Sequence, residues 1–152
     1  MQTKVMFYVL PGGENTSDEA ELALLVHQAC LQAAYFYRQN KKVFIYTQDQ
    51  NQAHNIDEIL WSFEPDSFVA HNLAGEGTRA GSPVEISWQN PTTKRVILIN
   101  LTSTVPNFAN NFSTIIDFVP TKTLLKQQAR DRYRTCKQWG FLVESQPAPT
   151  IT

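Results

Sequence analysis

The chain has 152 residues, of which 42% are hydrophobic, and a formal net charge of −1 at neutral pH. This size and apolar content are those of one ordinary domain with its own core. The near-neutral charge excludes a general nucleic-acid-coating protein, because phosphate binding over a whole face needs a clear surplus of Lys and Arg. Any basic partner-binding surface must therefore be local.

The cysteines and the N-terminus indicate the compartment. Cys30 and Cys136 lie far apart in apolar or helical patterns, which favours buried thiols in a reducing cytosol over a disulfide. The N-terminal apolar run is too short for a signal peptide, and no stretch of about 18 apolar residues occurs elsewhere. We expect a soluble, cytoplasmic protein.

The first half of the chain alternates between strand and helix patterns. Apolar runs at Val5–Leu10 and Val43–Tyr46 predict two buried strands. Between them, a capping-box pattern at Thr16 and Glu19 opens a long amphipathic helix. A second helix is expected after Asp49, which can cap it. This order implies parallel strands joined by right-handed crossovers.

Short strands and one final helix are predicted for the second half. The expected strands are, in chain order, Ser67–Ala70, Val84–Trp88, Val96–Leu101 and Ile115–Val119. The final helix is expected from about Lys122 to Trp139, where Gly140 stops it. Residues 144–152 are proline-rich and are expected to form a loose tail. The pattern predicts a single α/β domain over residues 1–143, with a mainly parallel sheet flanked by helices.

Two glycine-rich segments raise the question of nucleotide binding. Gly75, Gly77 and Gly81 have the spacing of neither nucleotide fingerprint, and a strand pattern follows them instead of a helix. Gly12-Gly13 lies between a strand and a helix, where dinucleotides bind, but the fingerprint's third glycine is missing and nearby acids would repel a diphosphate. A small nucleotide-dependent enzyme is therefore the alternative hypothesis, and no cofactor is predicted.

The reactive side chains form no evident catalytic or metal-binding set. The three histidines lack metal-ligand spacing. His27 and Cys30 could form a thiol–imidazole pair, although helix packing is the simpler interpretation. His71 follows a predicted strand, but no nucleophile completes a set. Glu76 and Glu85 could form a carboxylate pair, although solvated side chains are the simpler interpretation.

Positive charge concentrates on the predicted final helix. Between Thr121 and Gly140 there are six basic residues and one acid, or +5, so the rest of the chain sums to −6. This asymmetry indicates an anionic partner. Helical spacing places five side chains on one face: Lys126, Arg130, Tyr133, Arg134 and Lys137. A neighbouring stripe is expected to pack onto the sheet: Leu125, Ala129, Arg132 and Cys136.

Three interpretations of the basic face are open. A solvated helix whose cations complement the helix dipole needs no partner. Nucleic acid would bind only modestly and with strong salt dependence. An acidic peptide with a hydrophobic end fits better, because Arg side chains grip carboxylates while Tyr133, Val119 and Pro120 offer apolar contacts.

A group of aromatic residues forms a second candidate surface. Trp61, Phe63 and Phe68 lie near a predicted helix end and the segment after it. Taken alone, the pattern favours core positions for these rings. Exposed to water, they would be anchors for a partner protein.

Three segments carry a resemblance to a known family: DEILWSFEPDSFVAHNLAGEG, GSPVEISW and DFVPTKTLLKQQARDRYRTCKQWGF. In these residues and their order, the chain resembles the chi subunit of bacterial DNA polymerase III holoenzyme, an accessory protein of the clamp loader. The resemblance extends from about residue 5 to residue 143. It implies a nucleotide-binding-like α/β fold that holds no nucleotide, no catalytic activity, and a glycine loop with a structural role.

The resemblance also implies partners and the residues that bind them. One partner is the psi subunit of the clamp loader, for which Trp61 and Phe68 would form the surface; a helicase could take its place. The other is single-stranded DNA-binding protein, whose acidic C-terminal tail ends in an aromatic residue with a free carboxylate. Its receptor would comprise Lys126, Arg130, Tyr133, Arg134 and Val119. With the resemblance, an interface position is favoured over a core position for Trp61 and Phe68.

Overall fold

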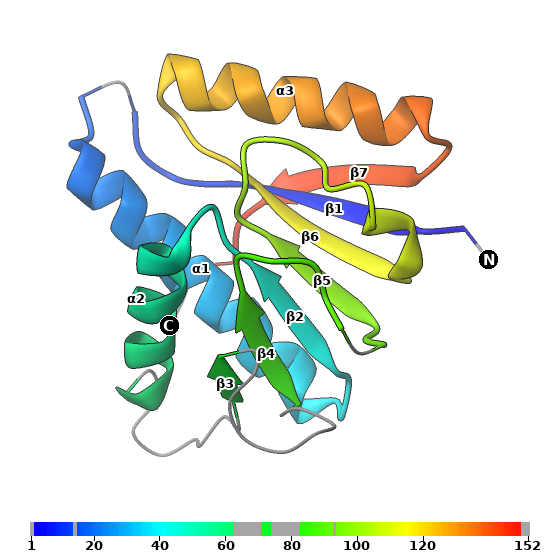
Figure 1. Cartoon of the computed structure of the whole chain (residues 1–152). Helices are drawn as coiled ribbons and strands as arrows, with labels where there is room; N and C mark the ends of the chain where they lie inside the picture. Colours follow the sequence, from blue (N-terminus) through cyan, green and yellow to red (C-terminus); the bar gives the residue numbers. More distant parts are fainter. Residues whose placement is uncertain (1, 14, 63–70, 74–82, 93, 150–152) are drawn as a thin grey trace.

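The computed structural model describes residues 2–13, 15–62, 71–73, 83–92 and 94–149 (Figure 1). The elements, in chain order, are β1 (Lys4–Val9), α1 (Asp18–Arg38), β2 (Val43–Tyr46), α2 (Gln50–Ser62), β3 (His71–Leu73), β4 (Val84–Ser87), β5 (Ile97–Asn100), the short 3₁₀ helix η1 (Ala109–Asn111), β6 (Thr114–Val119), α3 (Thr123–Gln138) and β7 (Leu142–Pro147). Every predicted strand within the described residues is present. The prediction for 67–70 lies outside them, and so do Phe68, Glu76 and the loop with Gly75, Gly77 and Gly81.

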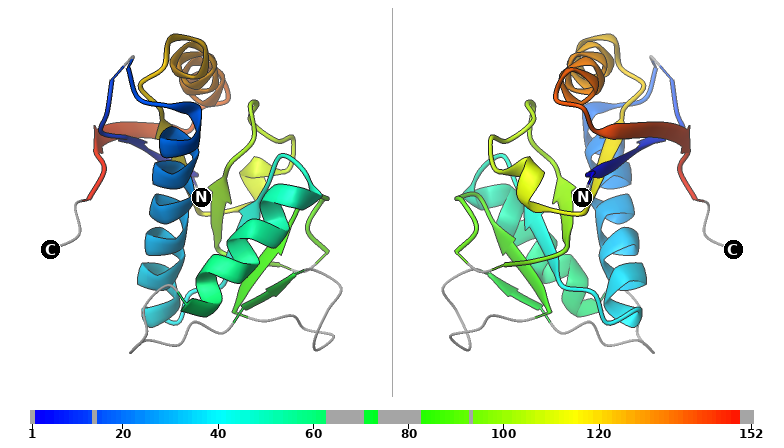
Figure 2. Two further views of the ribbon diagram at one scale, coloured as in Figure 1. Left: turned by 90° about the vertical axis from the view of Figure 1, so that its left-hand side faces the viewer. Right: turned by 90° about the vertical axis from the view of Figure 1, so that its right-hand side faces the viewer.

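All the strands of the sheet are parallel, in the order β3-β4-β2-β5-β6-β1-β7. Helices α1 and α2 cover one face of the sheet, and α3 and η1 cover the other. In Figure 1, α1 passes behind the strands while α3 runs along β6, β1 and β7; Figure 2 shows the layers from both sides. The predicted α/β fold with a parallel sheet flanked by helices is confirmed.

The core has two parts because side chains alternate across each strand. In β2, Val43 and Ile45 contribute to the cluster under α1 and α2, while Phe44 contributes to the cluster under α3 and η1. The Phe44 ring lies 6.3 Å from the rings of both Phe108 and Phe112. The continuous apolar run of β2 thus supplies core side chains to both faces of the sheet, as expected for a central parallel strand.

Side-chain caps begin the first two helices. Asp49 Oδ1 accepts a hydrogen bond from the Gln52 amide at 2.8 Å, which confirms the predicted cap of α2. For α1 the capping residue is Ser17, whose Oγ accepts from the Ala20 amide at 3.1 Å, and not Thr16. Thr16 Oγ1 instead accepts from the Gly13 amide at 3.0 Å, because the turn after β1 needs that bond to close.

The C-terminal segment differs from its prediction. Residues 144–147 were expected in a loose tail, but they belong to β7, which pairs in parallel with β1 from Lys4↔Leu142 to Val9↔Pro147. Beyond β7, the Ala148 amide donates to the Val9 carbonyl at 2.9 Å. The proline content indicated a loose tail, but Pro is compatible with an edge strand. Strand β7 also covers the edge of β1, which would otherwise be open.

No helix within the described residues is long and apolar enough to cross a membrane.

Removing β7 should destabilise the fold. We expect a chain truncated after Gly140 to lose several kcal/mol of unfolding free energy, because it leaves β1 paired with β6 alone and removes the backbone hydrogen bonds of the six residue pairs between β1 and β7. Urea denaturation measures the loss. A chain truncated after Pro149 is the control and should match the parent; equal stability of both truncations would contradict the role of β7.

Candidate protein-binding surface on helix α3

The beginning of α3 is held by a carboxylate from another helix. Glu21 of α1 is buried, and its Oε1 accepts from the backbone amides of Thr121 at 2.9 Å and Lys122 at 3.2 Å. Lys122 Nζ also contacts Asp18 Oδ1 at 2.6 Å. These contacts put negative charge at the positive end of the α3 dipole, which stabilises the helix start.

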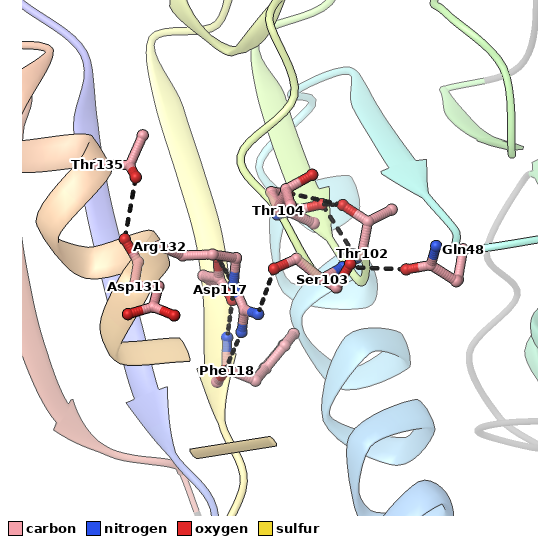
Figure 3. Close-up of polar contacts among 10 residues, drawn as sticks. Gln48, Thr102, Ser103, Thr104, Asp117, Phe118, Asp131, Arg132 and Thr135 are labelled. Carbon is pink, nitrogen blue, oxygen red and sulfur yellow. Dashed lines mark hydrogen bonds and ion pairs between the residues drawn. The ribbon is translucent and has the colours of Figure 1, made fainter. Parts of the chain in front are cut away.

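A buried ion pair fixes α3 on the sheet (Figure 3). Arg132 Nε lies 3.0 Å from Asp117 Oδ2 of β6, and both side chains are nearly inaccessible to solvent. The guanidinium also donates to the carbonyls of Ser103 at 3.2 Å and Phe118 at 3.0 Å. One side chain thereby ties α3 to β6 and to the segment after β5, and so sets which face of the helix points outward.

The sheet-facing stripe of α3 is close to its prediction. Ala129, Arg132 and Cys136 are buried as expected, whereas Leu125 is 39% exposed because it lies in the first turn, beyond the end of β6. Arg132 is consequently not part of the outward charge. It is one of the six basic residues between Thr121 and Gly140, and its charge is neutralised internally by Asp117.

Four cations of α3 remain on the solvent side: Lys126, Arg130, Arg134 and Lys137, here called the cationic face. Within the described residues, Lys126 and Arg130 have no ion-pair partner. Arg134 Nη1 lies 3.3 Å from Asp131 Oδ1, but both groups are more than 60% exposed, so solvent screens this pair. From Lys126 to Lys137 the face is about 16 Å long at 1.5 Å per residue.

Apolar groups lie beside the cationic face. Tyr133 is half-buried, with its ring 5.3 Å from Phe7 and 5.1 Å from Lys137 Nζ. Val119 is half-buried against the same core cluster, and its partner in register, Val9, is 42% exposed. The predicted receptor residues thus come from one helix and from the strand that leads into it.

The second predicted surface lies on another part of the molecule, at the end of α2. Trp61 is 63% exposed, and its ring lies 4.8 Å from the ring of His71 in β3. His71 is itself buried, with Nε2 3.1 Å from the Asp57 carbonyl, so it supports the Trp61 ring from within. Phe68, the other predicted residue of this surface, and Phe63 lie outside the described residues.

The place where a nucleotide would bind in this topology is filled by the protein's own groups. Amides that could hold a phosphate are already bonded to Thr16, Ser17 and Glu21. A Cβ at Gly12 would lie 3.0 Å from Thr16 Oγ1 and 3.3 Å from Thr121 Oγ1, so this glycine allows two segments of the chain to approach closely. The residue serves packing, and phosphate binding has no support here.

Two further reactive groups, Cys30 and Glu85, are buried in the fold. Burial raises the pKa of the Cys30 thiol to about 12, which leaves it protonated at neutral pH and a poor nucleophile. Glu85, for which solvation was the simpler expectation, is buried with Oε2 3.3 Å from Arg95 Nη2. This pair links β4 to the start of β5. In the described part of the chain, no three His, Cys, Asp or Glu side chains are grouped for a metal ion.

Comparisons with known proteins show which family the chain belongs to. The family model described as DNA polymerase III chi subunit, HolC, matches residues 1–144. The chain belongs to this family. DNA polymerase III subunit chi of Escherichia coli is 42% identical over 137 residues, which cover 89% of this chain and 91% of the relative. The Haemophilus influenzae subunit is 45% identical over 115 residues, covering 74% and 80%.

A third chi subunit and one solved structure extend the comparison. The Pseudomonas aeruginosa subunit chi is 33% identical over 150 residues, covering 98% of this chain and 99% of the relative. The structure of T4 UvsW matches with a TM-score of 0.62 at 9% identity; the match covers 97% of this chain but 42% of that one, and shows the fold alone. The expectation of a non-catalytic accessory subunit agrees with the family, whose relatives are named as the chi subunit.

Two positioning residues escaped the sequence analysis. Asp117 stands in the apolar strand TIIDFV, and Glu21 is buried in a first turn whose other acids, Asp18 and Glu19, are exposed. A lone carboxylate in a buried strand was a usable signal, because such a group needs a partner, and Arg132 in the sheet-facing stripe supplies it. Nothing comparable identified Glu21, since acids are common at helix starts for the dipole alone.

Replacing Arg132 should be far more costly than replacing an exposed Arg of the same helix. We expect Arg132→Met to lower the unfolding free energy by about 3–5 kcal/mol, because it leaves Asp117 buried without its partner. Arg130→Met is the matched control and should cost no more than about 0.5 kcal/mol. Denaturant unfolding compares them, and similar losses would contradict the anchoring role.

The pH dependence of the Arg132→Met variant gives a separate check. Burial raises the pKa of the Asp117 carboxyl, and Arg132 opposes that rise. Without Arg132 the pKa in the folded state rises further, so the folded variant binds the proton more tightly than the unfolded chain. Its deficit relative to the parent should therefore shrink as the pH falls from neutral to about 5. A deficit independent of pH would argue against a stranded carboxylate.

Proposed function

We propose that this chain is a cytoplasmic adaptor of the replication machinery that connects two other proteins. In this proposal, the cationic face of α3 binds the acidic C-terminal tail of single-stranded DNA-binding protein, and the surface with Trp61 and Phe68 binds the psi subunit of the clamp loader. Membership in the chi subunit family supports the setting, and the exposed cations of α3, of which Lys126 and Arg130 have no ion-pair partner among the described residues, support the site.

The strongest support for tail binding is the pairing of charge with an apolar contact. Lys126 and Arg130 are exposed without ion-pair partners in the described structure, so binding a carboxylate breaks no existing salt bridge. Arg130 can form a forked pair with a carboxylate, including the free C-terminus of a peptide. Tyr133 and Val119 offer carbon surface beside these cations for an aromatic side chain. Acidic residues and a terminal aromatic ring complement this combination.

Support for the psi surface comes from the exposure of a large aromatic ring. Trp61 exposes 63% of its surface while His71 and α2 hold it from beneath. An exposed, well-supported Trp is the kind of side chain that anchors protein interfaces. The cationic face is borne by α3 on the opposite face of the sheet from α2, so both partners can be bound at once (Figure 2).

Simultaneous binding explains what such an adaptor does. Once one partner is bound, contact with the other becomes effectively intramolecular. The local concentration of the tail near its binding face is then high, so that even a weak tail contact is occupied. The tail contact itself should weaken with salt, because exposed charges supply much of it.

Loss of Arg130 should weaken tail binding. We expect Arg130→Ala to cost about 1–3 kcal/mol of binding free energy, the range for a hydrogen bond to a charged group. Calorimetric titration with a peptide of the tail measures it. Gln127→Ala, a neighbouring residue outside the cationic face, is the control and should bind as the parent does. A variant that binds as tightly as the parent would refute the assignment of this face.

The tail peptide itself provides a second comparison within that experiment. A peptide whose C-terminal carboxylate is amidated should lose affinity for the parent, and it should lose little more on Arg130→Ala if Arg130 contacts that carboxylate. If the affinity losses from amidation and from Arg130→Ala are additive, Arg130 contacts another acidic group of the tail and not its C-terminal carboxylate.

Trp61 should matter for psi and not for the tail. We expect Trp61→Ala to weaken binding to purified psi by at least about 2 kcal/mol, the loss typical of an aromatic anchor, while leaving tail-peptide affinity unchanged. Pull-down and calorimetry with the two partners separate these effects. Unchanged psi affinity with folded protein would rule out this surface. Leu124→Ala, an exposed apolar residue of α3, is the control for psi binding.

A further inference from the structure

Four lysines from three distant parts of the chain meet at one edge of the sheet. Lys4 is the first residue of β1, Lys41 and Lys42 precede β2, and Lys94 precedes β5. Because all strands are parallel, their N-terminal ends lie at the same edge, opposite the edge where α3 begins. These four residues, here called the basic edge, are not used by the proposed adaptor function.

The strand register fixes how the basic edge is arranged. Lys4 is paired with Thr114 of β6, Thr114 with Ile97 of β5, and Ile97 with Val43, which follows Lys42. The amides of Val96 and Ile97 donate to the Lys42 carbonyl at 3.1 and 3.0 Å. Three strand spacings of about 4.8 Å therefore separate Lys4 from Lys42, so the cations follow a line of roughly 14 Å.

Charge on this edge is exposed and almost uncompensated. All four lysines are exposed, and within the described residues none of them has an ion-pair partner. The described residues just before the strands contain no Asp or Glu. Glu144 in β7 lines a cleft with Lys4, and Glu85 in β4 is paired with Arg95. The edge therefore carries a local positive field although the chain as a whole has a charge of −1.

Exposed aromatic rings lie at both sides of the basic edge. Trp139 is 46% exposed, and its loop is held at the start of β1 by the hydrogen bond from Gln2 Nε2 to the Gly140 carbonyl at 2.8 Å. The Trp139 ring is supported edge-on by Phe141 at 5.8 Å. On the other face of the sheet, Tyr35 is 53% exposed and its ring lies 5.1 Å from that of Phe36.

The surface is also hollowed on both sides of the edge. A cleft of about 310 Å³ is lined by Lys4, Lys41 and Tyr35, together with parts of β6 and β7. A second cavity of about 420 Å³ is lined by Lys94, Asn111 and Phe112. Cations, aromatic rings and concave surface thus occur together at one place.

We propose that the basic edge, with Trp139 and Tyr35 beside it, binds single-stranded nucleic acid. The lysines would follow the phosphates of the strand, and the two exposed rings would stack against unpaired bases. Binding of this kind combines a cationic track with aromatic platforms and needs no sequence readout. Its affinity rests on a few phosphate contacts and is correspondingly low and salt-dependent.

The geometry favours a nucleic acid over an acidic polypeptide. An acidic peptide is gripped best by the forked guanidinium of Arg, whereas the basic edge consists of lysines, which act as point charges. Exposed rings on either side of the lysines add stacking surface that polyglutamate or a similar chain cannot use. Double-stranded DNA is also disfavoured, because its stacked bases are not available to Trp139 and Tyr35.

The test measures the salt dependence of binding to a fluorescein-labelled oligothymidylate of about 20 nucleotides by anisotropy, with no other protein present. For single strands, log K falls with log salt by about 0.7 for each neutralised phosphate. Replacing Lys4 and Lys41 by Gln should therefore lower the slope by about 1.4 and weaken binding about tenfold at low salt. Lys122→Gln, at the opposite edge of the sheet, should leave both unchanged.

Trp139 supplies the test of stacking. Trp139→Ala should weaken binding about fivefold or more without changing the salt slope, and Trp139→Phe should retain most of the affinity. No saturable binding by the parent at low salt would overturn the proposal, and so would an equal effect of Lys122→Gln and Lys41→Gln. Polyglutamate that binds as tightly as the oligonucleotide, with no sensitivity to Trp139→Ala, would assign the edge to an acidic polypeptide instead.

Discussion

The buried contact between Arg132 and Asp117 determines how the last helix is presented. A guanidinium bonded to a strand carboxylate and to two carbonyls has one orientation, and a helix that carries it cannot rotate about its axis. Lys126 and Arg130 therefore face solvent because Arg132 faces the sheet. Arginine thus has two roles on this helix. The buried Arg132 fixes the orientation of the helix, and that orientation directs the exposed Arg130 and Arg134 toward solvent.

At the C-terminal edge of the sheet, the chain's own side chains occupy the amides that a nucleotide phosphate would need. In doubly wound folds a ligand phosphate usually meets helix amides at this edge. Here the carboxylate of Glu21 accepts hydrogen bonds from the amides at the start of α3. The Thr16 hydroxyl accepts one from the Gly13 amide. These amides are therefore already hydrogen-bonded within the chain.

Much of the fold could be predicted from local patterns, while the site depended on contacts between distant residues. The apolar runs of β1, β2 and β6 and the period of α1 and α3 identify elements because burial imposes them. The inward turn of Arg132 required knowing that Asp117 lies beneath it. The pairing of β7 with β1 spans almost the whole chain, and local composition, dominated by proline, indicated the opposite. Helical spacing alone placed the residues of the cationic face, whereas charge left their ligand open and the family resemblance implied one.

The central place of β1 has a consequence for how the chain is made. Strand β1 is synthesised first, yet its two neighbours in the sheet, β6 and β7, are the last strands to be made, and Gln2 and Gly140, which are hydrogen-bonded, lie 138 residues apart. An emerging chain can form α1 and the β2 region, but β1 has no partner in the sheet until β6 (Thr114–Val119) has left the ribosome. Such long-range pairing slows folding and leaves a bare strand exposed to aggregation. Of the strands of the sheet, β1 is therefore the one that waits longest for its neighbours.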